Sequence, residues 1–297
     1  MSWPMANKFQ PATRLSATNA FPGGPWLAAA APPPNRLTLV LGRPGAGKTV
    51  LALQILACGA RRGESSLFVS FAPKPAALLE TAARFGWDLA EMEKQNLVLL
   101  LQRKPPRVRK TGRLNLGGAL AALRVKAAEL GARRIIFDGL DQWLPFAYQP
   151  ISAMEDLYRL RDWLYEHQFA GLVTVGWPDP SSGTCQALLP LAADCTIWLS
   201  ASQAGDGAAR HMQLAKCRGF ATAQEDLGFV IGQAGIEVIG EPHERPATAA
   251  AGEAEFTREV AHARSAVFGD LRVLDRFLEL KQAELDFRLA QQATGGT

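Results

Sequence analysis

The segment "GRPGAGKT" (residues 42–49) constrains the fold of this chain more than any other stretch. It follows the apolar run "LTLVLG" (37–42) and precedes "TVLALQILACGARRG" (49–63), which has the pattern of a helix. A strand, a glycine-rich turn and a helix are therefore expected in that order. Glycines let the backbone turn tightly and aim several N–H groups at one point, in front of the positive end of the helix dipole. The segment predicts a loop that binds phosphate groups.

The residue types in this loop suit the phosphates of a nucleotide. We expect the Lys48 ammonium to reach the β- and γ-phosphates and the Thr49 hydroxyl to bind Mg²⁺. ATP and Mg²⁺ are therefore the cofactors that the sequence predicts. The expected nucleotide-binding residues are Gly42, Arg43, Pro44, Gly45, Ala46, Gly47, Lys48, Thr49 and Val50.

An acidic residue at the end of a second apolar strand would complete the metal site. The segment "RRIIFDGLD" (133–141) supplies one, because Asp138 directly follows three large apolar residues. We predict that Asp138 and Thr49 hold the Mg²⁺ ion. Asp141 lies further round the loop and is not the first choice.

Beyond the loop, short apolar runs alternate with helical patterns as far as about residue 194. Such alternation predicts an α/β fold with a mostly parallel sheet. After Cys195 the helical patterns stop, and four successive strands are expected to extend the same sheet in antiparallel fashion. The expected strands are 37–42, 66–71, 97–102, 133–140, 171–176, 195–201, 209–219, 227–233 and 235–240.

Four regions are expected along the chain. Residues 1–35 form an N-terminal arm rich in Pro and Ala, and residues 36–240 form the nucleotide-binding domain. A linker over 241–255 leads to C-terminal helices over 256–291. These helices carry a wide apolar stripe, which needs a surface to cover. That surface is either the chain's own domain, another subunit or a partner helix.

Composition excludes several classes of protein. No stretch approaches the length of a membrane span, and the N-terminus lacks the pattern of a secretory signal, so we expect a cytoplasmic protein. The four cysteines have no metal-ligand spacing, and we expect reduced, mostly buried thiols rather than a zinc site or disulfides. They are Cys58, Cys185, Cys195 and Cys217.

The segment "QRKPPRVRKTGR" (102–113) contains six basic residues and no acidic one. Such a patch could bind nucleic acid or an acidic protein. However, it has no aromatic residue on which a base could stack. We therefore favour a solvated basic loop, with nucleic acid as the alternative.

The chain from about residue 20 to residue 240 resembles the KaiC-like branch of the RecA superfamily of ATPases. The resemblance is carried by "GRPGAGKT", by "LFVSF" and the later "RFGWDL" (84–89), by "RRIIFDGL", and by "LAKCRG" (214–219) before "GIEVIG". It implies a RecA-like core and a homo-oligomeric ring, usually of six, with ATP between neighbouring subunits. It also implies that Lys216 and Arg218 reach the γ-phosphate of the next subunit. The alternative for this basic pair is a solvated strand edge.

The chain departs from this family directly after the strand "LFVSF". Family members commonly carry two glutamates there, and one of them polarises the attacking water. Here the positions are Ala72 and Pro73; Lys74 has the wrong charge and Glu80 lies further along the next helix. A water-positioning group contributes ~10²–10⁴-fold in rate. We therefore expect very little ATP hydrolysis.

A second departure concerns self-phosphorylation. The clock protein of this family phosphorylates a neighbouring Ser and Thr in the segment that aligns with residues 185–194. Pro190 and Leu191 occupy those positions, so autokinase activity is not expected. We interpret the chain as a Mg-ATP-binding protein of a ring, with a scaffold or signalling role and at most slow hydrolysis. The alternatives are an active ATPase, including a DNA-linked motor that uses another carboxylate, and a monomeric nucleotide sensor.

Overall fold

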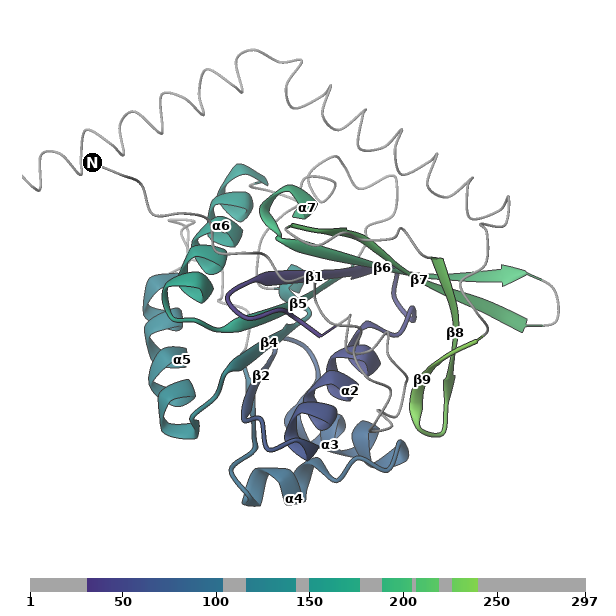
Figure 1. Cartoon of the computed structure of the whole chain (residues 1–297), viewed down its shortest axis with the longest axis horizontal. Coiled ribbons are helices and arrows are strands. Elements are labelled where there is room, and N and C mark those ends of the chain that lie inside the picture. The colour runs from purple at the N-terminus through teal and green to yellow at the C-terminus, as the bar shows by residue number, and fades with distance from the viewer. Residues whose placement is uncertain are drawn as a thin grey trace, which may run out of the picture.

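The computed structural model describes residues 31–103, 116–142, 150–176, 189–204, 207–218 and 226–239. The strands in this part of the chain form one nine-stranded sheet in the order β3-β2-β4-β5-β1-β6-β7-β8-β9 (Figure 1). Their bounds are β1 Leu37–Gly42, β2 Ser66–Ser70, β3 Val98–Gln102, β4 Arg134–Asp138, β5 Ala170–Gly176, β6 Cys195–Ala204, β7 Gly207–Cys217, β8 Asp226–Gly232 and β9 Gly235–Val238.

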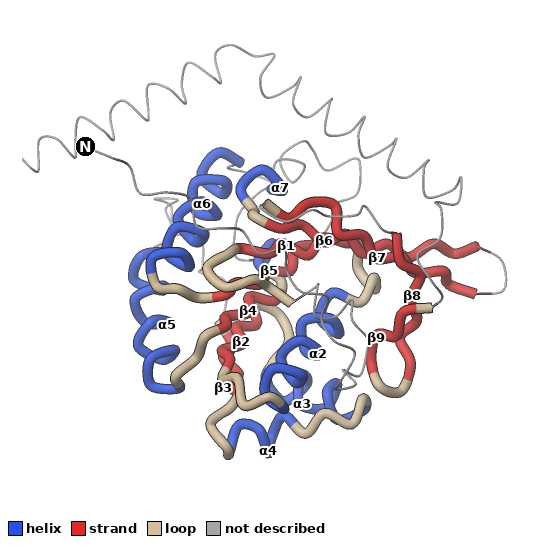
Figure 2. Tube along the Cα trace, in the orientation of Figure 1, coloured by secondary structure: helices blue, strands red, loops and turns tan. Residues whose placement is uncertain are grey.

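Neighbouring strands from β3 to β6 are parallel, and those from β6 to β9 are antiparallel. This arrangement confirms the predicted α/β fold of RecA type, with a mostly parallel sheet and an antiparallel extension. The helices lie on both sides of the strands, as Figure 2 shows. They are α2 Lys48–Arg61, α3 Pro75–Arg84, α4 Leu89–Lys94, α5 Leu116–Leu130, α6 Pro150–Glu166 and α7 Leu189–Ala192, with the short 3₁₀ helix η1 Leu140–Gln142.

The sheet separates two apolar cores. Helices α5, α6 and α7 cover one face, where Leu39 of β1 and Phe137 of β4 are buried. Helices α2, α3 and α4 cover the other face together with β8 and β9, and there Val40 and Phe68 are buried. Alternate residues of a strand point to opposite faces, so a central strand covered on both sides is apolar throughout. This explains why the parallel strands appear in the sequence as continuous apolar runs.

Local signals set the ends of two helices. α3 begins at Pro75, a residue suited to the first turn of a helix because its missing N–H is not needed there. α4 is capped by the Asp88 carboxylate, which accepts a hydrogen bond of 3.0 Å from the Glu91 N–H. The preceding Trp87 is buried against the core. The segment "RFGWDL" thus joins α3 to α4 and anchors the connection.

The cysteine prediction is wrong for two of the four residues. Cys195, the first residue of β6, and Cys217, the last of β7, form a disulfide with 4.0 Å between their Cα atoms. The two residues face each other directly in the antiparallel register of these strands. A pairing made by strand register is not visible in cysteine spacing, because the partners are 22 residues apart. Cys58 is a free, buried thiol.

Several predicted segments lie outside the described residues. They are the arm up to residue 30, most of the basic segment (its residues 104–113), the linker and the C-terminal helices, together with Cys185. Within the described residues, no helix is both long enough and apolar enough to cross a membrane.

Candidate nucleotide-binding site

The predicted phosphate loop lies where β1 ends and α2 begins. Gly45 and Gly47 have φ angles of +79° and +106°, in the left-handed region that glycine adopts without strain. The Leu51 N–H donates to the Gly47 carbonyl at 2.9 Å, so the first helical hydrogen bond starts at the loop itself. The N-terminus of α2 therefore faces the loop, as binding of a phosphate requires.

Lys48, the first residue of α2, folds over this loop. Its Nζ donates to the carbonyl oxygens of Gly42 at 2.7 Å and Arg43 at 3.0 Å. Burial lowers the pKa of the Lys48 ammonium, and the carboxylates of Asp141 and Asp138 act in the opposite direction. The ammonium is thus held at the loop, where phosphate oxygens would compensate its desolvation.

Asp138 is the centre of a buried network of three side chains. The Thr174 hydroxyl donates to its Oδ1 at 2.6 Å, and the Thr49 hydroxyl lies 3.0 Å from its Oδ2. The carboxylate is only 2% exposed, and burial raises its pKa even though both threonines and Lys48 act to lower it. The sequence predicted the pair of Asp138 and Thr49 but missed Thr174, which lies within β5.

The Thr49 and Asp138 pair fits a magnesium ion. Mg²⁺ prefers oxygen ligands and is often held by one carboxylate together with the phosphates of the substrate. Here a hydroxyl and a carboxylate converge next to the phosphate loop. Burial raises the pKa of the Asp138 carboxyl, and a cation bound beside it would act to lower that pKa.

Asp141 lies at this site, although the sequence placed it too far round the loop. After β4 the chain turns through Gly139, which has a φ of +78°, into η1. The turn brings the Asp141 Oδ1 to 2.9 Å from the Gly176 N–H, at the end of β5. Gly176 faces Gly42 in the register of β5 and β1, so Asp141 lies next to the start of the phosphate loop.

The hairpin of β8 and β9 packs against the loop and α2. A Cβ atom on Gly47 would lie 3.1 Å from the Ile231 side chain of β8. The buried Gln54 of α2 donates to the Ile236 carbonyl at 3.1 Å and accepts from the Ile236 N–H at 2.7 Å. This reciprocal pair ties the antiparallel extension to the helix that carries the phosphate loop.

β7 places basic residues at both ends of the sheet. Arg210, near its start, donates to the carbonyl of Gly45 in the phosphate loop at 2.5 Å. Lys216, near its end, lies beside Cys217, which faces Cys195. Cys195 in turn pairs with Thr38 at the start of β1. Lys216 therefore lies at the end of the sheet opposite its own phosphate loop.

The predicted basic pair contacts α7. The Lys216 Nζ donates to the carbonyls of Pro190 and Ala193, each at 2.8 Å, and Arg218 donates to Leu191 at 3.1 Å. Burial lowers the pKa of Lys216, and the nearby Arg218 lowers it further. The pair therefore holds two close positive charges against the carbonyl end of a short helix.

The segment after β2 provides no carboxylate. Ala72 is exposed, and the Ser70 hydroxyl donates to the Pro73 carbonyl at 2.9 Å, which closes the turn into α3. Glu80 forms an ion pair of 2.7 Å with Arg84 on α3, and its side chain is 69% exposed. Neither position places an acidic group at the phosphate loop.

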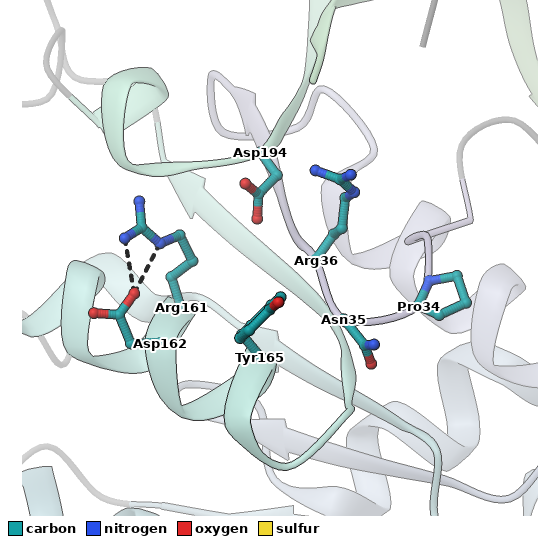
Figure 3. Close-up of a pocket in the computed structure, with 7 residues that line it drawn as sticks. All are labelled: Pro34, Asn35, Arg36, Arg161, Asp162, Tyr165 and Asp194. Carbon is teal, nitrogen blue, oxygen red and sulfur yellow. Dashed lines mark hydrogen bonds and ion pairs between the residues drawn. The ribbon is translucent and has the colours of Figure 1, made fainter. Parts of the chain in front are cut away.

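A separate pocket of about 440 Å³ lies at the opposite end of the sheet (Figure 3). Its charges balance, because Arg161 pairs with Asp162 at 2.7 Å across from Arg36 and Asp194. It adjoins the strand starts rather than the phosphate loop. Its lining residues are Pro34, Asn35, Arg36, Arg161, Asp162, Tyr165 and Asp194.

The fold and this site define a P-loop ATPase core of RecA type. A family model described as "ATPase: KaiC" matches residues 31–243. This match covers most of the chain, and the chain therefore belongs to the KaiC ATPase family, a family of nucleotide-binding proteins.

Named relatives agree with this assignment. The chain is 27% identical over 210 residues to "Circadian clock protein KaiC2" of Synechocystis sp., which is 70% of this chain and 37% of the relative. It is 30% identical over 156 residues to "Circadian clock protein KaiC3" of the same organism, covering 52% of this chain and 31% of the relative. A "UPF0273 protein" of Aeropyrum pernix is 29% identical over 117 residues, 36% of this chain and 47% of that protein. The chain spans roughly a third to a half of the length of these relatives.

Proposed function

We propose that this protein binds Mg-ATP between neighbouring copies of itself in a ring. In this proposal it hydrolyses the bound ATP slowly or not at all. In this proposal ATP stabilises a cytoplasmic assembly with a scaffold or signalling role. A nucleotide can favour an assembled state only through a higher affinity for that state. A site shared by two subunits has this property, because it is complete only in the assembly.

One observation supports the proposal: the residues proposed to bind Mg-ATP lie together, while the segment directly after β2 has no acidic residue at Ala72 or Pro73. Lys48, Thr49 and Asp138 converge at the end of β1. Ala72 and Pro73 can neither accept a proton nor orient a water. ATP would therefore bind well and be cleaved slowly.

The position of the basic pair supports a site shared between subunits. Lys216 pairs with Thr196, which pairs with Leu39, so three residues of β1 separate the level of Lys216 from Gly42. At about 3.3 Å per residue this is roughly 10 Å along the sheet, before the length of the phosphate loop is added. Lys216 and Arg218 are thus too far away to serve their own nucleotide. In a neighbouring subunit, two such cations would neutralise the charge on the γ-phosphate.

Calorimetry with Mg-ATP tests the binding step. The wild-type protein should release heat on titration, whereas Lys48→Ala should not. Lys74→Ala is the matched control, because Lys74 is exposed just before α3 and should leave the heat unchanged. Absence of heat with the folded wild-type protein would rule out the proposed function.

Light scattering and phosphate release test the remaining steps. We expect the molar mass to rise to a multiple of the 32.0 kDa chain when Mg-ATP is added. Phosphate release should be slow in the same samples. A mass of one chain with bound ATP would favour a monomeric nucleotide sensor, and rapid release abolished by Lys48→Ala would favour an active ATPase.

A further inference from the structure

We propose that Asp141 directs the water that attacks the γ-phosphate, in place of the acid that is absent after β2. This inference rests on the proposed binding of Mg-ATP at the phosphate loop. It would provide a route to slow hydrolysis in a protein with Ala72 and Pro73 at the usual positions.

The backbone around Asp141 is firmly fixed. The Gln142 N–H donates to the Gly139 carbonyl at 3.0 Å, which closes the turn after β4. Leu140 is fully buried and anchors η1 in the core below α5 and α6. The carboxylate therefore stands on a rigid turn at the same edge of the sheet as Asp138 and the phosphate loop.

The two carboxylate oxygens of Asp141 have different surroundings. Oδ1 accepts the hydrogen bond from the Gly176 N–H at 2.9 Å, which fixes the orientation of the group. A Cβ atom on Gly176 would lie 3.2 Å from Oδ2, so the absence of a side chain there leaves room for this oxygen. Within the described residues, the structure shows no hydrogen-bond donor to Oδ2. That oxygen is available to accept a hydrogen bond from a water molecule.

Asp141 lies near the Lys48 ammonium, because Asp141 bonds to Gly176, Gly176 pairs with Gly42, and the Gly42 carbonyl accepts from Lys48. Of the described carboxylates, Asp141 and Asp138 are the two that act on the pKa of Lys48, and Asp141 acts more strongly. Lys48 is the residue expected to contact the β- and γ-phosphates. Asp138 is already engaged by Thr49 and Thr174. Asp141 is therefore the carboxylate at this edge that remains for a water molecule.

The proposed step is an ordinary hydrolysis. The water oxygen forms a bond to the γ-phosphorus, and the bond to the β,γ-bridging oxygen breaks with its electron pair remaining on ADP. Oδ2 of Asp141 accepts the proton that the water loses and returns it to the phosphate product or to solvent. The products are ADP and inorganic phosphate, and no other reactant is needed.

Two substitutions separate this role from a purely structural one. Asp141→Asn keeps an oxygen that can accept from the Gly176 N–H but removes the proton acceptor. Asp141→Ala removes both. Asp162→Asn is the matched control, because this exposed aspartate pairs with Arg161 on α6, away from the loop.

Phosphate release should be measured with the protein in excess over Mg-ATP, and binding by calorimetry on the same variants. We expect Asp141→Asn to slow release by about 10²-fold, within the range for a lost general base. Its ATP affinity should stay within a factor of about two, because the amide still bonds to Gly176. Asp162→Asn should behave as the wild type in both measurements.

Three results would overturn the inference. They are a wild-type rate in Asp141→Asn, a loss of ATP binding in that variant, and wild-type release too slow to detect. Failure of the proposed function is seen separately, as an absence of heat when Mg-ATP is titrated into the wild-type protein.

Discussion

The Thr174 hydroxyl donates a hydrogen bond of 2.6 Å to Oδ1 of Asp138. The same hydroxyl accepts from the Gly139 N–H at 2.8 Å, so it links β5 to the turn after β4. The carboxylate is therefore oriented before any metal binds. Because the carboxylate is already oriented, less rearrangement of these side chains is needed when a metal ion or nucleotide binds.

Replacing Thr174 with valine should destabilise the protein. Valine has nearly the same shape but leaves a buried carboxylate with one donor fewer and the Gly139 N–H without its acceptor. We expect the free energy of unfolding to fall by about 1–3 kcal/mol. We also expect ATP binding to need a higher Mg²⁺ concentration to reach half of its maximum. Urea unfolding and calorimetry measure these changes.

Thr81→Val is the matched control for this prediction. The Thr81 hydroxyl bonds to the Ala77 carbonyl within α3 and is exposed. An exposed change of this kind should alter stability by less than about 0.5 kcal/mol. Equal effects of the two substitutions would show that the Asp138 network does not contribute to stability.

The charge on Asp138 should make the nucleotide-free protein sensitive to pH. Burial raises the pKa of this carboxyl in the folded state, so the folded protein binds its proton more tightly than the unfolded chain. Protonated Asp138 therefore contributes fully to the stability of the fold below the pKa that this carboxyl has in the unfolded chain. The contribution is lost as the pH rises through the pKa that it has in the folded protein. Asp138→Asn does not titrate and should not show this loss.

Urea unfolding from acidic to neutral pH measures the difference between these two proteins. The stability of the wild type relative to Asp138→Asn should decrease as the pH rises. Adding Mg-ATP should reduce the decrease in the wild type alone, because a cation compensates the ionised carboxylate. A relative stability that increases with pH would contradict the direction assigned to the pKa of Asp138.

The sequence predicted the elements whose signals are local. The phosphate loop and the strand ending at Asp138 each depend on residues within a few positions of one another. The alternation of apolar runs with helical patterns also predicted an α/β fold with a mostly parallel sheet. These signals are sufficient for the fold class and for the position of the candidate site.

The sequence did not predict contacts made by strand register or by a turn. Thr174 looks like an ordinary residue of the strand "GLVTVG", and only the pairing of β4 with β5 places it beside Asp138. Asp141 reaches the site because η1 turns the chain back towards β5. The Cys195–Cys217 disulfide likewise requires the register of β6 and β7. Such non-local pairings have no signature in residue spacing.

The disulfide should stabilise the strands that carry the basic pair. Its sequence separation of 22 residues corresponds to about 3 kcal/mol of lost chain entropy in the unfolded state. We expect Cys217→Ser to lower the free energy of unfolding by an amount of this order, in the absence of reductant. Addition of a dithiol should bring the wild type close to the variant.

Cys58→Ser is the control for the thiol chemistry, because Cys58 is free. Its stability should not depend on the dithiol any differently from that of the wild type. Titration of thiols in unfolded protein, before and after reduction, should reveal two additional thiols. If reduction adds no thiols, Cys195 and Cys217 are not joined in the purified protein.

A glutamate placed after β2 should raise the rate of hydrolysis. Ala72 is exposed at the end of this strand, so the longer side chain fits without displacing the core. We expect Ala72→Glu to speed phosphate release by about 10-fold or more, since a positioned base contributes ~10²–10⁴-fold when ideally placed. Ala76→Glu, a change of the same type on α3, is the control. Unchanged release in Ala72→Glu would show that the missing acid does not limit the rate.

Mixed assemblies should reveal whether Lys216 and Arg218 act on a neighbouring subunit. Lys48→Ala removes the phosphate-loop cation, and Lys216→Ala/Arg218→Ala removes the pair at the opposite end of the sheet. Each variant alone should lose ATP-dependent assembly. In a mixture, the loop of one variant can meet the basic pair of the other, so a fraction of the interfaces is complete. Assembly measured by light scattering should therefore be partly restored.

The outcome distinguishes three arrangements. If the pair serves its own nucleotide, every chain in the mixture carries a defective site and assembly is not restored. If the pair only supports α7 through the carbonyls of Pro190, Leu191 and Ala193, the double variant should lose stability but keep ATP-dependent assembly. Restoration in the mixture requires that the two defects lie in different halves of one composite site, since neither variant supplies a complete site by itself.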